Sequence, residues 1–352
     1  MIPAKSKLTR FALDSLYFSG AHHVFTPTWS GVGVIFTLHH VRPRVHDTAF
    51  SPNAILEITP DFLESVIQIA LKAGYEFISM DELQRRLVEQ DFRKKFVSFT
   101  LDDGYLDNYQ YAFPIFKKYN VPFTVYLNTG LPDGSAILWW WLLEFIIRDH
   151  NEIEFLLDDQ KLKLTSRTPG QKYQAFNHIY WLLRGMPQTK QYEAIFNLFD
   201  NYSVDPQIFC RASTMSWDMI KELSDSDLGT IGAHTVNHFA LSKLSDEEVR
   251  NEAASSRDII TQHTQIIPRH FSYPYGDPFS AANREFAIIE DLKFATATTT
   301  RKGLLYPQHA QHLFALPRVS LNGYYQKQRY VKLFLSGAPF ALWQGFQRIN
   351  VN

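Results

Sequence analysis

The sequence has a single cysteine and no excess of charge of either sign. With Cys210 alone, the chain can form neither an internal disulfide framework nor a zinc site built from cysteines. The formal net charge is −1, so no general basic field attracts nucleic acid or anionic lipid. No run approaches about 18 uncharged apolar residues, so no transmembrane helix is predicted. Asp14 interrupts the N-terminal apolar run and no small-residue cleavage site follows, which favours an amphipathic helix over a signal peptide and hence a cytoplasmic location.

The chain does have enough apolar residues for a large core. Of its 352 residues, 45% are hydrophobic, which excludes a disordered or fibrous protein. Apolar segments with strand character alternate with helical patterns, and such alternation predicts parallel strands joined by helical crossovers. We therefore expect an α/β fold, an irregular (β/α) barrel of seven to eight parallel strands with a mostly helical insertion. The predicted strands span residues 33–41, 75–79, 96–101, 122–127, 230–232, 270–273, 294–299 and 315–321.

The alternation stops over about residues 132–213, where the sequence is aromatic-rich and mostly helical in pattern. Some eighty residues exceed an ordinary connection, so we interpret this segment as an insertion with its own packing and a charged hairpin near 153–164. The predicted organisation is an N-terminal helical segment (1–32), a barrel with this insertion (33–323) and a C-terminal helical segment (324–352).

Asp102 and Asp103 directly follow the predicted strand 96–101, and Gly104 allows a sharp turn after them. The carboxyl ends of the strands hold the active site in parallel α/β barrels. Two adjacent carboxylates there repel each other unless a cation or a proton separates them. A structural alternative is that Asp103 or Asp107 caps the next helix.

His234 and His238 follow another predicted strand. Their spacing of four residues would place both imidazoles on one side of a helical turn, which suits chelation of one metal ion. Two histidines and one aspartate would leave coordination positions open, as in catalytic sites. The alternative is that both are ordinary hydrogen-bonded polar residues.

A third motif, Tyr273-Pro274-Tyr275-Gly276, also follows a strand. Such a turn fixes the backbone direction and can aim a main-chain N–H into a pocket, although it can equally be a plain turn.

Taken together, Thr100–Gly104, His234–His238 and Tyr273–Gly276 resemble the motifs of the polysaccharide deacetylase family, the nodulation protein B homology domain of carbohydrate esterase family four, which includes chitooligosaccharide deacetylases. The resemblance covers about residues 33–323 without the insertion. It implies that Asp103, His234 and His238 bind a divalent metal, most often zinc. It further implies that Asp102 is the general base on a metal-activated water and that the Tyr275 N–H holds the oxyanion. The implied substrate is an acetylated poly- or oligosaccharide, and the implied reaction is hydrolysis of its N- or O-acetyl groups, with N-acetyl favoured over O-acetyl.

Two positions depart from the family pattern. Ser272 stands where many relatives carry an arginine that orients the base, and Arg318 lies in a segment where many carry a Leu-x-His that holds the general acid. The proton donor is therefore open. His39 and His40 at the end of the first strand are our candidates, with His312 and Arg318 as weaker ones.

The insertion opens with Trp139, Trp140 and Trp141, which could stack on sugar rings but which we expect to be core, since three successive residues cannot share one helical face. Residues 324–346 are expected to form a basic, aromatic packing helix.

Two other functions fit parts of the pattern. Two histidines and a carboxylate also form the iron site of non-haem oxygenases, although Asp102 and the barrel pattern favour hydrolysis. A catalytically degenerate barrel that only binds glycan would account for the two departures.

Overall fold

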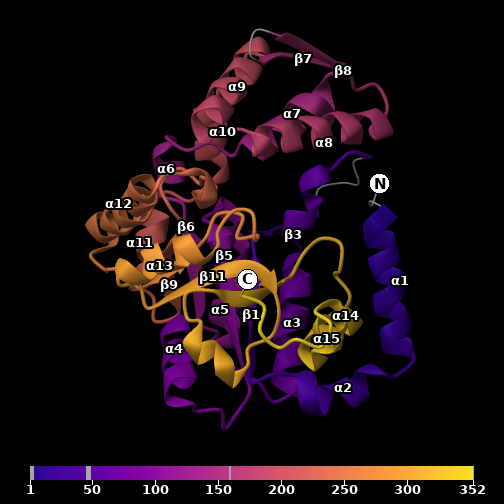
Figure 1. Ribbon diagram of the computed structural model, residues 1–352, viewed down its shortest axis with the longest axis vertical. Helices are drawn as coiled ribbons and strands as arrows, with labels where there is room; N and C mark the ends of the chain where they lie inside the picture. Colours follow the sequence, from indigo (N-terminus) through magenta and orange to yellow (C-terminus); the bar gives the residue numbers. More distant parts are fainter. Residues whose placement is uncertain (1–3, 45–48, 158–159, 352) are drawn as a thin grey trace.

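The computed structural model describes residues 4–44, 49–157 and 160–351. Seven parallel strands form a closed barrel, because β1 pairs with both β12 and β5 (Figure 1). One further short strand, β4 (Glu76–Phe77), pairs with the start of β5. This confirms the predicted barrel of seven to eight parallel strands. In barrel order the strands are β1 (Gly33–Leu38), β12 (Leu316–Ser320), β11 (Thr296–Lys302), β10 (His270–Ser272), β9 (Gly229–Ala233), β6 (Phe123–Leu127) and β5 (Phe96–Asp103).

Helices cover the outside of the barrel, and several begin at the residue types that favour helix starts. The side chains of Thr59, Ser216 and Ser245 each accept a hydrogen bond from a backbone N–H in the first turn of the helix that follows. The predicted helix over 109–119 instead begins as a π-turn (Asn108–Ala112) and becomes α-helical at Phe113. The covering helices are α3 (Pro60–Lys72), α4 (Met80–Glu89), α5 (Phe113–Tyr119), α11 (Trp217–Asp225), α12 (Asp246–Thr264) and α13 (Asn283–Asp291).

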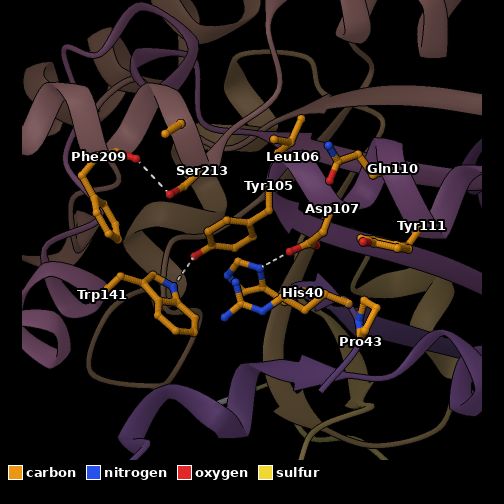
Figure 2. Close-up of a pocket in the computed structure, with 12 residues that line it drawn as sticks. His40, Pro43, Tyr105, Leu106, Asp107, Gln110, Tyr111, Trp141, Phe209 and Ser213 are labelled. Carbon is orange, nitrogen blue, oxygen red and sulfur yellow. Dashed lines mark hydrogen bonds and ion pairs between the residues drawn. The ribbon is translucent and has the colours of Figure 1, made fainter. Parts of the chain in front are cut away.

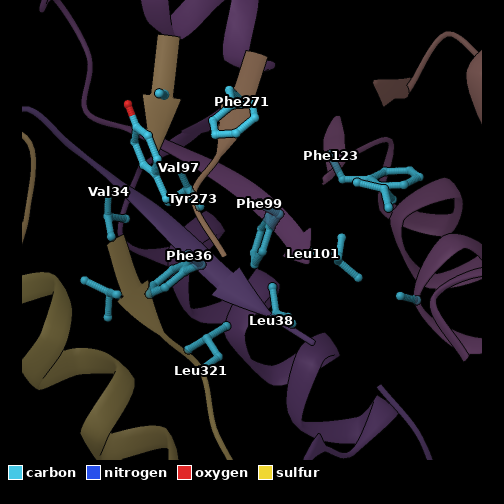
Figure 3. Packing of buried hydrophobic residues seen from close by; sticks show 14 of the residues in the cluster. Val34, Phe36, Leu38, Val97, Phe99, Leu101, Phe123, Phe271, Tyr273 and Leu321 are labelled. Atoms are coloured by element: carbon cyan, nitrogen blue, oxygen red, sulfur yellow. The ribbon is translucent and has the colours of Figure 1, made fainter. Parts of the chain in front are cut away.

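Alternation along β5 separates an apolar face from a polar one. Val97, Phe99 and Leu101 belong to a buried cluster that includes residues of α3 and β1 (Figure 3). The residues between them are Ser98 and Thr100, so the polar side chains of this strand point to the opposite face. Since one face packs against helices, the other faces the barrel interior, and Asp102 continues this polar row at the carboxyl end of the strand.

The segment between β6 and α11, at the top of Figure 1, supplies most of a second hydrophobic cluster, to which Phe50 and Tyr105 also belong. A β-hairpin, formed by β7 (Glu152–Leu157) and β8 (Gln160–Thr165), occupies the predicted hairpin position; residues 158–159 lie outside the described residues. Trp139, Trp140 and Trp141 are all buried in this cluster, as expected. The helices are α6 (Gly130–Asp133), α7 (Trp139–Asp149), α8 (Pro169–Gly185), α9 (Gln188–Asn201) and α10 (Pro206–Ser213).

Helices from both ends of the chain pack together on one side of the barrel (Figure 1). Arg329 of α14 makes a two-pronged ion pair with Asp14 of α1, at 2.7 and 3.0 Å. The single helix expected over 324–346 is instead two helices, because Gly337 adopts a left-handed conformation between them. Among the described residues, no helix combines the length and apolar character needed to cross a bilayer. The terminal helices are α1 (Ala4–Phe18), α2 (His22–Trp29), α14 (Gln328–Ser336) and α15 (Ala338–Trp343).

Candidate active site

Asp103 and the two histidines meet at the carboxyl ends of β5 and β9. The Asp103 Oδ1 atom lies 3.4 Å from His234 Nε2 and 3.3 Å from His238 Nε2. One ligand atom from each residue falls within 4.8 Å of the others, and all three side chains are almost fully buried. The structure therefore brings together the three residues that were predicted to bind a metal.

The backbone at Asp103 departs from the strand geometry. Asp103 has φ 77°, and Gly104 follows with φ 85°. A left-handed conformation is costly for a residue other than glycine, and such conformations gather at functional sites. Neither Asp103 nor Asp107 caps the following helix, so the structural alternative for these carboxylates is wrong. The Asp107 side chain instead accepts hydrogen bonds from the Val41 amide and His40.

The two imidazoles do not share a helical turn, and that part of the prediction is wrong. His234–His238 is a loop in which Thr235 and His238 both have positive φ. Buried Glu252 of α12 holds this loop, since its carboxylate accepts hydrogen bonds from the amides of Val236 and Asn237 at 2.9 Å. The loop therefore depends on a carboxylate that the sequence motif does not contain.

The hydrogen-bonding pattern of the three residues fits a bound cation. His234 Nδ1 lies 2.7 Å from the Ser272 carbonyl, to which it can only donate, so neutral His234 presents a bare lone pair at Nε2. Asp103 Oδ1 is buried and has no hydrogen-bond partner among the described residues. Two electron-rich atoms that face each other at this distance are stabilised by a positive charge between them, which a proton or a metal ion can supply. In a tetrahedral site with bonds of about 2.0–2.1 Å, neighbouring ligand atoms lie about 3.3–3.4 Å apart, which is the spacing of Asp103 Oδ1 from both nitrogens.

The electrostatics favour the deprotonated forms of Asp103 and His238. Burial opposes the charge on Asp103, but its interactions with His234 and His238 outweigh burial and hold the pKa of this carboxyl well below its ordinary value. For His238, burial outweighs the attraction of Asp103 and lowers the imidazole pKa. An ionised carboxylate and neutral imidazoles are the forms that bind metals.

Asp102 is held by Arg318 rather than by an arginine next to the Tyr-Pro-Tyr-Gly motif. The Arg318 guanidinium donates to Asp102 Oδ1 at 2.7 Å and to Oδ2 at 2.6 Å. It also donates to the Ser272 hydroxyl at 3.0 Å, at the position where many relatives carry an arginine. Burial would raise the pKa of Asp102, but the adjacent guanidinium outweighs it and keeps that pKa below its usual value. Arg318 is thus fully buried in an ion pair with Asp102. A guanidinium held in this way does not release a proton, so the prediction of Arg318 as a weaker candidate for the proton donor is wrong.

His39 and His40 occupy different environments. His39 directly follows β1, so it stands at the same end of the barrel as the cluster. Burial lowers the pKa of His39, and the charges of Asp103 and Asp102 oppose that effect. His40 turns to the neighbouring pocket, where its Nδ1 lies 2.5 Å from Asp107 Oδ2 and its ring packs on Tyr105 with centroids 3.6 Å apart (Figure 2). His312 precedes β12, so it lies at the opposite end of the barrel from the cluster and does not belong to the site.

The Tyr275 backbone forms a strained turn beside the cluster. Its φ is 61°, the Gly276 amide donates to the Pro274 carbonyl at 2.7 Å, and Thr300 of β11 donates to the Tyr275 carbonyl at 2.7 Å. A γ-turn with positive φ is rare. Within the described part of the chain, the Tyr275 N–H has no acceptor, so it is free to bind a ligand oxygen.

The insertion contacts the site through aromatic side chains. Trp139 donates to the Tyr275 hydroxyl at 3.3 Å, the Trp140 ring lies 5.0 Å from that of His238, and Arg184 stacks on the Tyr275 ring at 3.4 Å. The tryptophans are therefore both core residues of the insertion and part of the wall of the site.

The fold and the site together define a (β/α)-barrel protein with a buried carboxylate–imidazole centre at the carboxyl ends of its strands. The sequence profile described as polysaccharide deacetylase matches residues 89–154 and 171–295, more than half of the chain. The chain belongs to the polysaccharide deacetylase family, which acts on carbohydrates. No curated protein matches the chain.

Solved structures with the same fold include deacetylases from several bacteria. The deacetylase PplD from Streptococcus pyogenes, in complex with acetate, has a TM-score of 0.54 and 21% identity, with 82% of this chain and 92% of that chain covered. IcaB from Ammonifex degensii has a TM-score of 0.52 and 17% identity, with 85% and 97% covered. A de-N-acetylase from Aggregatibacter actinomycetemcomitans has a TM-score of 0.54 and 14% identity, with 86% and 99% covered.

Proposed function

We propose that this protein is a metal-dependent hydrolase that removes N-acetyl groups from a poly- or oligosaccharide. The observation that carries the proposal is the convergence of Asp103, His234 and His238 beside Asp102, whose carboxylate Arg318 holds in place. Zinc is the metal that two imidazoles and one carboxylate with an open position suit best. When bound, it would lower the pKa of water from about 15.7 towards 7 and polarise the acetyl carbonyl.

Each nearby group has one task in the reaction. Asp102 accepts the proton of the attacking water, and the Arg318 fork keeps its two oxygens fixed. The Tyr275 N–H stabilises the oxygen that becomes negative as water adds to the acetyl carbon; one such donor contributes about 3–4 kcal/mol in comparable sites. When the carbon–nitrogen bond breaks, His39 in its protonated form, which burial disfavours and the two carboxylates favour, gives a proton to the sugar nitrogen, and acetate and a free amine leave.

The N-acetyl preference rests on the leaving group. An amine cannot depart as an anion, so amide hydrolysis needs a proton donor near the cluster, and His39 provides one. The de-N-acetylase with the same fold supports this choice. The iron site of a non-haem oxygenase needs only two histidines and one carboxylate. It does not require a second carboxylate such as Asp102, which Arg318 holds in place here. A barrel that only binds glycan has no need for a base, a proton donor and three converging ligands.

The test is acetate release from a panel of acetylated glycans, each assayed with zinc, cobalt and nickel. We expect release from at least one N-acetylated oligosaccharide, and loss of that release after chelation with recovery on adding metal. Metal-loaded protein that releases no acetate from N- or O-acetylated glycans would contradict the proposal.

A further inference from the structure

Helix α1 is apolar on two opposite faces, and only one of them is packed. Leu13, Leu16 and Tyr17 face the molecule and pack with the hydrophobic core. On the outer face, Leu8 and Phe18 are 70% and 73% exposed. A helix with apolar residues on all sides is normally covered on all sides, so the outer face of α1 lacks a partner among the described residues.

The outer face of α1 forms one continuous stripe at the edge of the molecule (Figure 1). Leu8, Phe11 and Phe18 recur at helical spacing, and Phe11 is 71% exposed. The other exposed residues between positions 8 and 19 are small and uncharged: Ala12, Ser15 and Ser19. No charged side chain therefore interrupts the exposed part of this stripe, which is unusual for a helix surface in water.

Exposed apolar side chains also occur on the helices next to α1. Val24 of α2 is 80% exposed. The neighbouring ring of Phe25 stacks on that of Phe346, which follows α15 and is itself exposed, with 6.3 Å between centroids. Both ends of the chain thus contribute apolar groups to the same set of packed helices.

The same two ends of the chain are strongly basic. Residues 1–32 and 324–352 contain seven lysines and arginines but only one acidic residue, Asp14, which Arg329 neutralises. The whole chain has 35 basic and 36 acidic residues, so the remainder carries an excess of seven acidic residues. The positive charge of the protein is therefore gathered on the helices that expose the apolar residues.

Two of these cations lie beside exposed apolar side chains. Lys7 is exposed one turn before Phe11 on α1. Arg348 is exposed and lies over the Trp29 ring at the end of α2, 5.3 Å from its centre. Neither cation forms an ion pair with another residue that the structure describes, so both charges are available to an anionic partner.

We infer that the outer face of α1, with the exposed apolar residues of α2 and of the segment after α15, binds the surface of a bilayer that contains anionic lipids. Aromatic and leucine side chains enter the boundary of the acyl chains, while lysines and arginines bind the headgroups. A second copy of the chain fits this face less well, because a symmetric contact would bring the same basic residues together. Such binding does not depend on the metal site or on acetyl hydrolysis, so it stands apart from the proposed function.

The test is co-sedimentation of the full chain with vesicles of phosphatidylcholine, with or without phosphatidylglycerol. We expect binding to the vesicles that contain phosphatidylglycerol at about 0.1 M salt, where charges are screened over about 10 Å. Binding should fall at least about 10-fold without phosphatidylglycerol, or at about 1 M salt, because the attraction of the basic residues to the headgroups is then lost.

A paired substitution tests the apolar stripe. Phe11→Ser combined with Phe18→Ser should weaken binding at least about 10-fold, since both rings would leave water in the bound state. Ile208→Ser combined with Ile267→Ser is the matched control, because these side chains are 68% and 64% exposed on other parts of the molecule. All four side chains are exposed, so both variants should melt at the temperature of the parent in circular dichroism.

A second pair tests the charges and remains informative if the phenylalanine variant does not fold. Lys7→Glu combined with Arg348→Glu should also lower binding at least about 10-fold. Lys117→Glu combined with Arg211→Glu changes the net charge equally at exposed sites of α5 and α10, and should bind almost as the parent does.

Four results would overturn the inference. The parent does not sediment with phosphatidylglycerol vesicles, or it binds pure phosphatidylcholine equally well. Either test pair binds as well as its control pair. Sedimentation velocity shows a dimer that the phenylalanine substitutions dissociate, in which case a second copy covers the face.

Discussion

Arg318→Lys is expected to lower kcat for acetate release by about 10²–10³-fold, with a much smaller change in KM. Arg318 fixes both oxygens of Asp102 through two parallel hydrogen bonds, and a lysine ammonium cannot reproduce that fork. General-base catalysis contributes about 10²–10⁴-fold, so a base that loses its orientation forfeits much of that factor. Steady-state kinetics on the best substrate of the glycan panel measures the effect.

The chain offers a matched control for this variant. Arg329 also forms a two-pronged pair with an aspartate, Asp14, but on the terminal helices. Arg329→Lys should leave kcat unchanged. Removing the buried charge altogether, as in Arg318→Met, is expected to cost about 3–5 kcal/mol of folding free energy as well, which is why lysine is the better probe. A kcat for Arg318→Lys equal to that of Arg329→Lys would show that Arg318 does not position the base.

Asp102→Asn is expected to lower kcat by about 10³–10⁴-fold while the bound metal stays constant. The amide keeps the shape of the side chain but cannot accept a proton, and Asp102 is not among the three converging ligands. The loss should appear with both an N-acetylated glycan and p-nitrophenyl acetate, because both need an activated water. Acetate release as fast as that of the parent would remove Asp102 from the mechanism.

A second variant, at His39, separates the role of the general base from that of the proton donor. His39→Gln should impair amide hydrolysis strongly but p-nitrophenyl acetate hydrolysis only slightly, since nitrophenolate departs without a proton. If both variants affect both substrates alike, the division of acid and base between His39 and Asp102 is wrong.

The fold and the convergence of Asp103 with the two histidines were predictable because they depend on local sequence pattern and on one topological rule. Alternating strands and helices indicate a parallel barrel, and the carboxyl ends of parallel strands meet at one end of it. Asp103 follows β5 and His234 follows β9, so their proximity follows from the topology. The route of the backbone between His234 and His238 was not predictable, because it depends on Glu252 from a distant helix and on two positive φ values.

The partner of Asp102 was missed for a related reason. Arg318 lies 216 residues from Asp102 in sequence, so no local spacing links them. One signal was present: a charged residue inside the apolar strand Leu316–Ser320 needs a buried partner of opposite charge. The different environments of His39 and His40 could not be predicted either, because they depend on a distant residue. Asp107 forms a hydrogen bond with the His40 ring and not with the His39 ring.

The central claim, that Asp103, His234 and His238 hold one metal ion, is tested most directly by counting metal per chain. The protein is stripped with a chelator, reloaded with zinc and analysed by atomic emission, alongside Asp103→Ala, His238→Ala and the control His263→Ala, a variant of an exposed histidine. We expect about one zinc per chain in the parent and in His263→Ala, and a large loss in the other two. One zinc per chain retained in both Asp103→Ala and His238→Ala would contradict the account.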